Sequence, residues 1–145
     1  MTKEDLLKGL TPEQKEKAIS YYNNALDQYS LVEYCIKNKL YNRLMSCCYY
    51  YIFNLCRAIM VIEASDTRSH KVLISDFNRI IVHERALFEK KYGSLLKNLE
   101  RQRSLCDYEA NYIIDKDLAL ILFNDTLEFA EILKDYLKQY GIGDA

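Results

Sequence analysis

Residues that interrupt secondary structure are scarce in this sequence, which has four glycines and one proline among 145 residues. Glycine and proline are the strongest local markers of turns and chain breaks. Long stretches without them, with apolar residues at every third or fourth position, predict extended amphipathic helices. No stretch of any length alternates polar and apolar residues as a half-buried strand does. We therefore expect an all-α fold.

The clearest helix start lies at Thr11 and Pro12. Thr11 can cap the first turn, Pro12 suits the first helical position, and Gln14 completes a capping box. From there apolar and aromatic residues follow one helical face as far as Ile36. The helix should end near Asn38.

A second predicted helix, Leu44–Ile62, is hydrophobic nearly all round. Such a helix belongs at the centre of a bundle or at a subunit interface. Its length would also suit a membrane span, but Asn54 and Arg57 lie in its interior. A bilayer would penalise the arginine by about 2.5–3.5 kcal/mol. We expect a buried central helix and no membrane contact.

The rest of the sequence predicts shorter segments and a long last helix. Ser69 can cap a short helix, the chain should turn or pause around Gly93, and Leu95–Cys106 forms a fourth helix. Asp115 can cap a last helix that ends at Gly141. Short connections favour antiparallel neighbours.

These elements together predict one domain. It covers residues 1–145, with its core at about 12–139, and forms an antiparallel bundle of four to five helices.

The cysteine pattern indicates a reducing environment. Five cysteines include no Cys-x-x-Cys pair, and with two histidines no zinc-binding spacing appears. The thiols are best interpreted as reduced and mostly buried. Glu4, Asp5 and Lys8 interrupt any apolar stretch near the start, so no signal peptide is expected. We predict a cytoplasmic protein without metal or other cofactor.

Charge is unevenly distributed along the chain, although the net charge is −1. Residues 37–103 hold thirteen basic and six acidic residues, a net charge of +7, and residues 104–145 hold three basic and nine acidic, a net charge of −6. This pattern suggests a positive face for an anionic partner such as RNA. It is equally compatible with opposite charges that pair across helices.

Arg103 is the foremost candidate for a functional residue. Its spacing from Leu99 and Cys106 places it on the apolar face of its helix, where a guanidinium needs a partner or an opening into a cleft. Asp107, one turn later, is the expected partner. With Tyr108 the two would form a polar cluster able to bind phosphate. An internal network that fixes helix packing is the other interpretation.

Other candidates have simpler explanations beside the functional one. Lys97 and Arg101, one turn apart, could contact phosphates or form a solvated face. Arg57 is better explained by an internal carboxylate than by RNA. The aromatic run Ser46–Tyr51 is typical of a core, and His70 of an exposed or capping residue at a helix start.

Three segments carry a family resemblance. Residues 40–53, Leu-Tyr-Asn-Arg-Leu-Met-Ser-Cys-Cys-Tyr-Tyr-Tyr-Ile-Phe, contain the pattern Ser-x-x-Tyr-Tyr-x-x-Phe. Ser69-His70-Lys71 precedes Phe77, and residues 103–108 read Arg-x-x-x-Asp-Tyr. In this order they resemble the HEPN superfamily (higher-eukaryote and prokaryote nucleotide-binding domains), the last motif resembling an uncharacterised bacterial branch. Together with Phe129, the resemblance covers roughly Ala18–Leu137.

The resemblance implies a bundle of four to five helices that forms a homodimer. In the active branches it implies a metal-independent endoribonuclease, often a toxin encoded beside a nucleotidyltransferase-like antitoxin. Those branches place an Arg and, four to six residues later, a His in a cleft between subunits. Here no His follows Arg103, and Tyr108 stands at the five-residue offset. Asp107 would have to act as the base, because the unperturbed pKa of tyrosine is about 10.

The predicted function follows from these points. We expect an RNA-binding or ribonuclease-like toxin component of a bacterial toxin–antitoxin or phage-defence module. The catalytic candidates are Arg103, Asp107 and Tyr108, and the RNA-binding candidates are Lys97, Arg101 and Arg57. The alternative is a non-catalytic dimeric helical module that binds a protein partner or a nucleotide.

Overall fold

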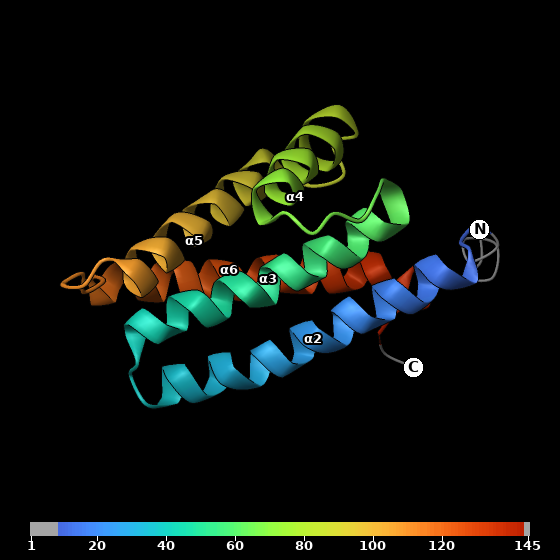
Figure 1. The fold of residues 1–145 in the computed structure, drawn as a ribbon. Helices are drawn as coiled ribbons and strands as arrows, with labels where there is room; N and C mark the ends of the chain where they lie inside the picture. Colours follow the sequence, from blue (N-terminus) through green and yellow to red (C-terminus); the bar gives the residue numbers. More distant parts are fainter. Residues whose placement is uncertain (1–8, 144–145) are drawn as a thin grey trace.

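The computed structural model describes residues 9–143, which form helices joined by turns (Figure 1). In chain order the helices are α2 (Pro12–Lys37), α3 (Tyr41–Glu63), α4 (His70–Asp76), the π-helix η1 (Phe77–Glu84), α5 (Lys90–Tyr108) and α6 (Lys116–Lys138). No strand occurs among the described residues. The predicted all-α bundle is confirmed.

The predicted helix starts are present. Thr11 and Gln14 form the capping box, with the Thr11 hydroxyl accepting from the Gln14 backbone at 3.1 Å and the Gln14 side chain accepting from the Thr11 backbone at 2.9 Å. The side chains of Ser69 and Asp115 accept backbone hydrogen bonds in the first turns of α4 and α6. Each cap satisfies a backbone N–H that the helix itself leaves without a partner.

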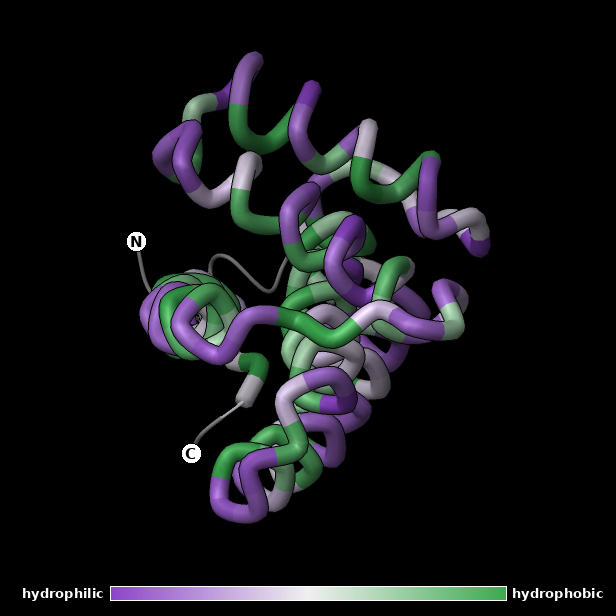
Figure 2. The backbone as a smooth tube through the Cα atoms, turned by 90° about the vertical axis from the view of Figure 1, so that its left-hand side faces the viewer, coloured by the Kyte–Doolittle hydropathy of each residue, from purple (hydrophilic) through white to green (hydrophobic). Residues whose placement is uncertain are grey.

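Helix α3 is the central helix of the fold and packs against α2, α5 and α6. In Figure 1, α2 and the segment formed by α4 and η1 lie on opposite sides of α3. Figure 2 shows hydrophobic residues gathered where the helices meet and hydrophilic residues on the outer turns. Helix α3 is long and apolar enough to cross a membrane, but 78% of its most apolar window is buried by the other helices. The prediction of a buried central helix is confirmed.

The prediction of a turn around Gly93 was wrong. Gly93 lies inside α5 and is buried, and the turn before this helix falls at residues 85–89. A Cβ at Gly93 would lie 2.7 Å from Oδ1 of Asn78, which belongs to η1. The glycine is therefore needed because two helices approach closely, and the chain does not bend there.

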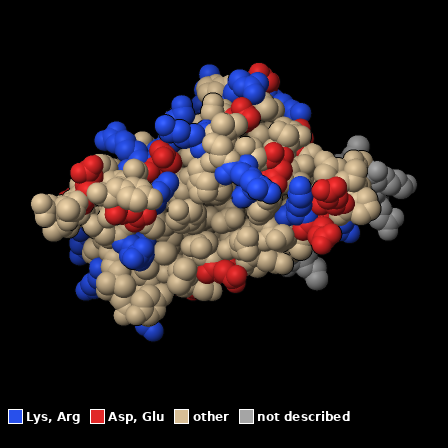
Figure 3. Space-filling model, in the orientation of Figure 1, with Lys and Arg blue, Asp and Glu red and all other residues tan. Residues whose placement is uncertain are grey.

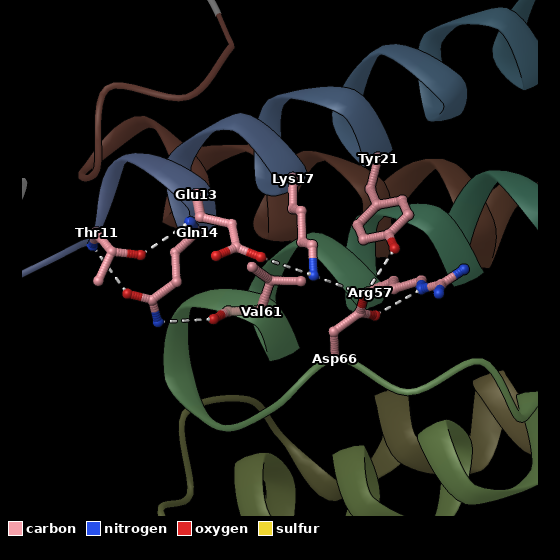
Figure 4. A network of polar contacts seen from close by, with 8 residues as sticks. All are labelled: Thr11, Glu13, Gln14, Lys17, Tyr21, Arg57, Val61 and Asp66. Carbon is pink, nitrogen blue, oxygen red and sulfur yellow. Dashed lines mark hydrogen bonds and ion pairs between the residues drawn. The ribbon is translucent and has the colours of Figure 1, made fainter.

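Arg57 is part of a polar network that joins α2, α3 and the α3–α4 loop (Figure 4). Its Nε donates to Oδ1 of Asp66 at 3.0 Å, and the Tyr21 hydroxyl donates to Oδ2 at 2.8 Å. Burial by itself raises the pKa of Asp66, but the hydrogen bonds from Arg57 and Tyr21 outweigh it and lower the pKa. The interpretation of Arg57 as the partner of an internal carboxylate is confirmed.

Candidate anion site around Arg103

Arg103 is buried on α5, with 9% of its surface exposed. Its Nε has no hydrogen-bond partner, and among the described residues no acidic side chain lies within ion-pair distance of the guanidinium. The expected pairing with Asp107 is absent. Oδ1 of Asp107 instead accepts from the Ser46 hydroxyl of α3 at 2.6 Å. Within residues 9–143 the Arg103 guanidinium therefore has no carboxylate partner, and the nearest acid on its helix, Glu100, acts on the neighbouring Tyr49 and His70 through its charge alone.

Tyrosine rings surround this guanidinium. Its Cζ lies 4.8 Å from the ring centroid of Tyr49, 5.7 Å from that of Tyr50 and 5.9 Å from that of Tyr108. The faces of aromatic rings attract cations through their quadrupole but carry no net charge. The rings therefore hold the guanidinium in place without cancelling its positive charge.

His70 joins the same cluster from α4. Its Nδ1 lies 3.0 Å from the Tyr49 hydroxyl, and its ring stacks on Phe53 with centroids 4.0 Å apart. Tyr49 and Phe53 are four residues apart and so share one face of α3. Arg103 from α5 and His70 from α4 thus meet at a single tyrosine. Sequence reasoning missed this pairing, although the Ser-His-Lys segment of the resemblance contains His70.

The protonation of these groups follows from their surroundings. Burial raises the pKa of Tyr49 to about 12, although the positive charge of Arg103 lowers it in part. Burial lowers the pKa of His70 below its ordinary value, and the charges of Arg103 and Arg57 lower it further. At pH 7 the tyrosine is therefore protonated and the histidine is neutral. A neutral imidazole can accept a proton.

Several residues predicted for the site lie elsewhere. Arg101 is exposed, because a spacing of two residues puts it about 200° around the helix from Arg103. The Arg57 side chain forms an ion pair with Asp66 in the network described above. Tyr108, the last residue of α5, is 73% exposed but still touches the site through its ring.

Two cavities are lined by neighbours of Arg103, although Arg103, Tyr49 and His70 themselves line neither. The first, about 490 Å³, lies between α4, η1 and α5, and its walls include Lys97 and Glu100. The second, about 620 Å³, is lined by residues of α2, α3 and the end of α5, including Tyr50 and Asp107. Glu100 precedes Arg103 by about one turn and Asp107 follows it by about one turn. Each cavity is therefore lined by one residue about a helical turn away from Arg103 on α5.

Some of the basic residues pair with acidic ones, as the second interpretation of the charge distribution expects. Arg57, Arg79 and Arg85 form ion pairs with acidic residues. Lys97 and Arg43 form none among the described residues. Figure 3 shows Lys and Arg spread over the α4, η1 and α5 side of the drawn face, with Asp and Glu between them. Lys97 lines the first cavity and Arg43 lines the second.

The cysteines and acidic residues offer no obvious metal site. Cys35, Cys47, Cys48 and Cys56 are buried free thiols, and Cys106 is a partly buried one. Within residues 9–143, no three His, Cys, Asp or Glu side chains gather closely enough to hold a metal ion.

Comparison with known families gives one match. The family model of the HEPN domain matches residues 18–136, a stretch that contains Tyr49, His70 and Arg103. A comparison with curated proteins gives no significant match. The family match extends from within α2 to within α6 and so covers most of the chain. The chain therefore belongs to the HEPN domain family, whose helical domains are associated with nucleotides and RNA.

Proposed function

We propose that this protein binds single-stranded RNA through Arg103 and cleaves it without a metal ion. The observation that carries the proposal is the buried guanidinium without a carboxylate partner, held beside a neutral histidine. A buried charge that lacks an opposite charge is costly and is retained where a ligand supplies that charge. The phosphodiester of RNA is such an anion, and the family association favours it over other anions.

The proposed reaction uses the 2′-hydroxyl of RNA as the nucleophile. Nε2 of His70 takes the proton of this hydroxyl, and the oxygen attacks the adjacent phosphorus. The bond from phosphorus to the 5′-oxygen breaks, and that oxygen takes up a proton. The products are a 2′,3′-cyclic phosphate and a 5′-hydroxyl end. Arg103 stabilises the charge that develops on the phosphoryl oxygens.

Tyr49 has a positioning role in this proposal. In the tautomer with the proton on Nδ1, His70 donates a hydrogen bond from Nδ1–H to the Tyr49 oxygen. The lone pair of Nε2 is then free for the reaction. Stacking on Phe53 fixes the plane of the imidazole ring. Because the pKa of Tyr49 is raised, its hydroxyl stays neutral over the working pH range.

His70 takes the place that sequence reasoning gave to Asp107. The carboxylate of Asp107 is held by Ser46 and lies away from the guanidinium. Tyr108 remains in the proposal as a partly open ring beside Arg103, where it can contact the RNA. The base thus precedes the arginine in the chain, which reverses the order expected from the active branches.

A cleavage and binding assay in EDTA tests the proposal. Labelled single-stranded RNA is incubated with the wild type and with His70→Gln and Arg103→Met. The matched controls are His83→Gln and Arg101→Met, which change exposed residues of the same types. We expect His70→Gln to bind RNA normally but cleave it about 10²–10⁴-fold more slowly. Arg103→Met should lose both activities.

The outcomes separate two functions. If the wild type binds RNA through Arg103 but does not cleave it, the result would favour the alternative, a non-catalytic module. The absence of a His after Arg103 supports that alternative. Equal cleavage by the wild type and both site variants would exclude the proposed site. The rate of the wild type should rise with pH through the lowered pKa of His70 and then level off.

The family association also supports a biological setting. We propose a cytoplasmic homodimer that acts as the toxin of a toxin–antitoxin or phage-defence module, with a nucleotidyltransferase-like antitoxin as its partner. Tyr108 and Ile113, 73% and 85% exposed, offer apolar surface at the α5–α6 end for such contacts. Light scattering of the purified protein tests the dimer, and co-expression with the neighbouring gene product tests the antitoxin.

A further inference from the structure

The cavity lined by α2, α3 and the end of α5 has no role in the reaction described above. We infer that it binds a nucleobase that carries an exocyclic amino group, from the nucleotide next to the phosphate held by Arg103. This inference rests on the proposed function, because it places RNA at Arg103. It adds a preference for base type that the phosphate contact cannot provide.

The walls of the cavity suit a flat, largely apolar ring. The cavity measures about 620 Å³, within the range of roughly 300–1,000 Å³ that is usual for small-molecule sites. Tyr34 and Tyr50 supply aromatic rings, and Leu31 and Leu40 supply aliphatic surface. Tyr34 is 61% exposed, so its ring is free to stack on a base.

Two charged side chains give the cavity its polar contacts. Arg43 lines it and forms no ion pair among the described residues, so it can contact a phosphate at the rim. Asp107 also lines it, and its Oδ1 is held by the buried Ser46. Oδ2 of Asp107 has no hydrogen-bond partner in the described part of the chain. A carboxylate oxygen fixed in this way is an acceptor for an amino group.

The carboxylate of Asp107 is a hydrogen-bond acceptor, and this property determines which bases we expect in the cavity. Adenine, cytosine and guanine carry an exocyclic amino group, and carboxylates accept hydrogen bonds from the amino group of cytosine. Uracil has a single N–H between two carbonyl oxygens, and these would face the carboxylate unfavourably. Asp107 therefore favours the amino-bearing bases over uracil.

The cavity and Arg103 are close enough to share one nucleotide. Tyr50 lines the cavity and its ring centroid lies 5.7 Å from Cζ of Arg103. Asp107 lies one helical turn after Arg103 on α5. Arg103 itself does not line the cavity, so Tyr50 and Asp107 are the residues that connect a phosphate at Arg103 with a base in the cavity.

Fluorescence anisotropy with labelled RNA homopolymers tests the inference. The probes are 2′-O-methyl oligo-A, oligo-C and oligo-U of about eight nucleotides, which lack the free 2′-hydroxyl that the proposed cleavage needs. They are measured at one salt concentration with the wild type and with Asp107→Ala, Tyr34→Leu and Arg103→Met. The control is Glu109→Ala, which removes a nearby exposed acid. Circular dichroism confirms that each variant is folded.

The expected pattern is specific to the cavity. The wild type should bind oligo-A and oligo-C about tenfold more tightly than oligo-U. Asp107→Ala removes the acceptor and should abolish most of this preference, and Glu109→Ala should keep it. Tyr34→Leu should weaken binding of oligo-A and oligo-C, and Arg103→Met should weaken binding of all probes.

Other results overturn the inference in distinguishable ways. Equal affinity for all three probes, with binding that still depends on Arg103, would remove the base site and leave the proposed function intact. No RNA binding by the wild type would remove both. If light scattering shows that Tyr34→Leu breaks a dimer while the base preference stays unchanged, a second copy of the chain occupies the cavity instead.

Discussion

Replacing Arg103 with methionine removes the charge at the centre of the site and keeps a long apolar side chain on α5. The lost contacts are those with three tyrosine rings at 4.8, 5.7 and 5.9 Å. Cation–π contacts of this kind contribute about 0.5–2 kcal/mol. The variant also removes a buried Nε without a partner, which costs about 1–3 kcal/mol in the wild type. We therefore expect the free energy of unfolding to stay within about 1 kcal/mol of the wild type or to rise.

Chemical unfolding in urea, followed by circular dichroism, measures this difference. Arg101→Met on the same helix is the control for the loss of an exposed arginine. Breaking a buried ion pair would instead cost about 3–5 kcal/mol. A loss of that size for Arg103→Met would show that the guanidinium has a structural counter-ion and would refute the reasoning.

The same variant has a second readout in the salt dependence of binding to the 2′-O-methyl oligomers, which the wild type cannot cleave. Each phosphate contact to single-stranded nucleic acid contributes about −0.7 to the slope of log K against log salt concentration. The slope for Arg103→Met should therefore be less negative than that of the wild type by about 0.7. An unchanged slope, measured with the same RNA, would mean that Arg103 does not contact a phosphate.

Three further predictions concern pH, the fold and helix contact. Folding lowers the pKa of His70, so the unfolded chain binds the proton at a higher pH than the folded chain does. The free energy of unfolding should therefore fall as the pH drops below about 6.5. His70→Gln should reduce this fall, as measured by urea unfolding at pH 7.5 and at pH 5. The Glu63 side chain accepts hydrogen bonds from Tyr136, Tyr140 and Arg85. Glu63→Ala should lower the free energy of unfolding by about 1–3 kcal/mol, measured in the same assay. Gly93→Ala should stabilise the protein by about 1 kcal/mol only in an Asn78→Ala background, where its Cβ no longer meets Oδ1, and a double-mutant cycle measures this coupling.

The prediction of helices succeeded because the signals that form them act within a few residues. The capping box at Thr11 and Gln14 and the caps at Ser69 and Asp115 all formed as expected. The apolar face of each helix followed from the spacing of its own residues. For the same reason the burial of Arg103 could be predicted from its neighbours on α5.

Sequence patterns within one segment did not predict the structure where packing against a second helix determines it. Gly93 resembles a chain break in sequence, but η1 packs so closely against it that a side chain would meet Asn78. The sequence also did not predict η1 itself, whose π-helical turns differ little in composition from α-helix. For Gly93 the deciding contact is with Asn78 of η1, which lies outside the local segment.

The site itself shows the same division. The sequence alone determined that the chain is helical, that α3 is its central helix and that a positive charge lies on the apolar face of α5. Only the tertiary structure decided that Tyr49 and His70, from two other helices, meet Arg103 and that Asp107 turns to Ser46. The reason is physical: a helix's own sequence sets which face is buried, but the partners of a side chain depend on the rotation and register of the helices packed against that face.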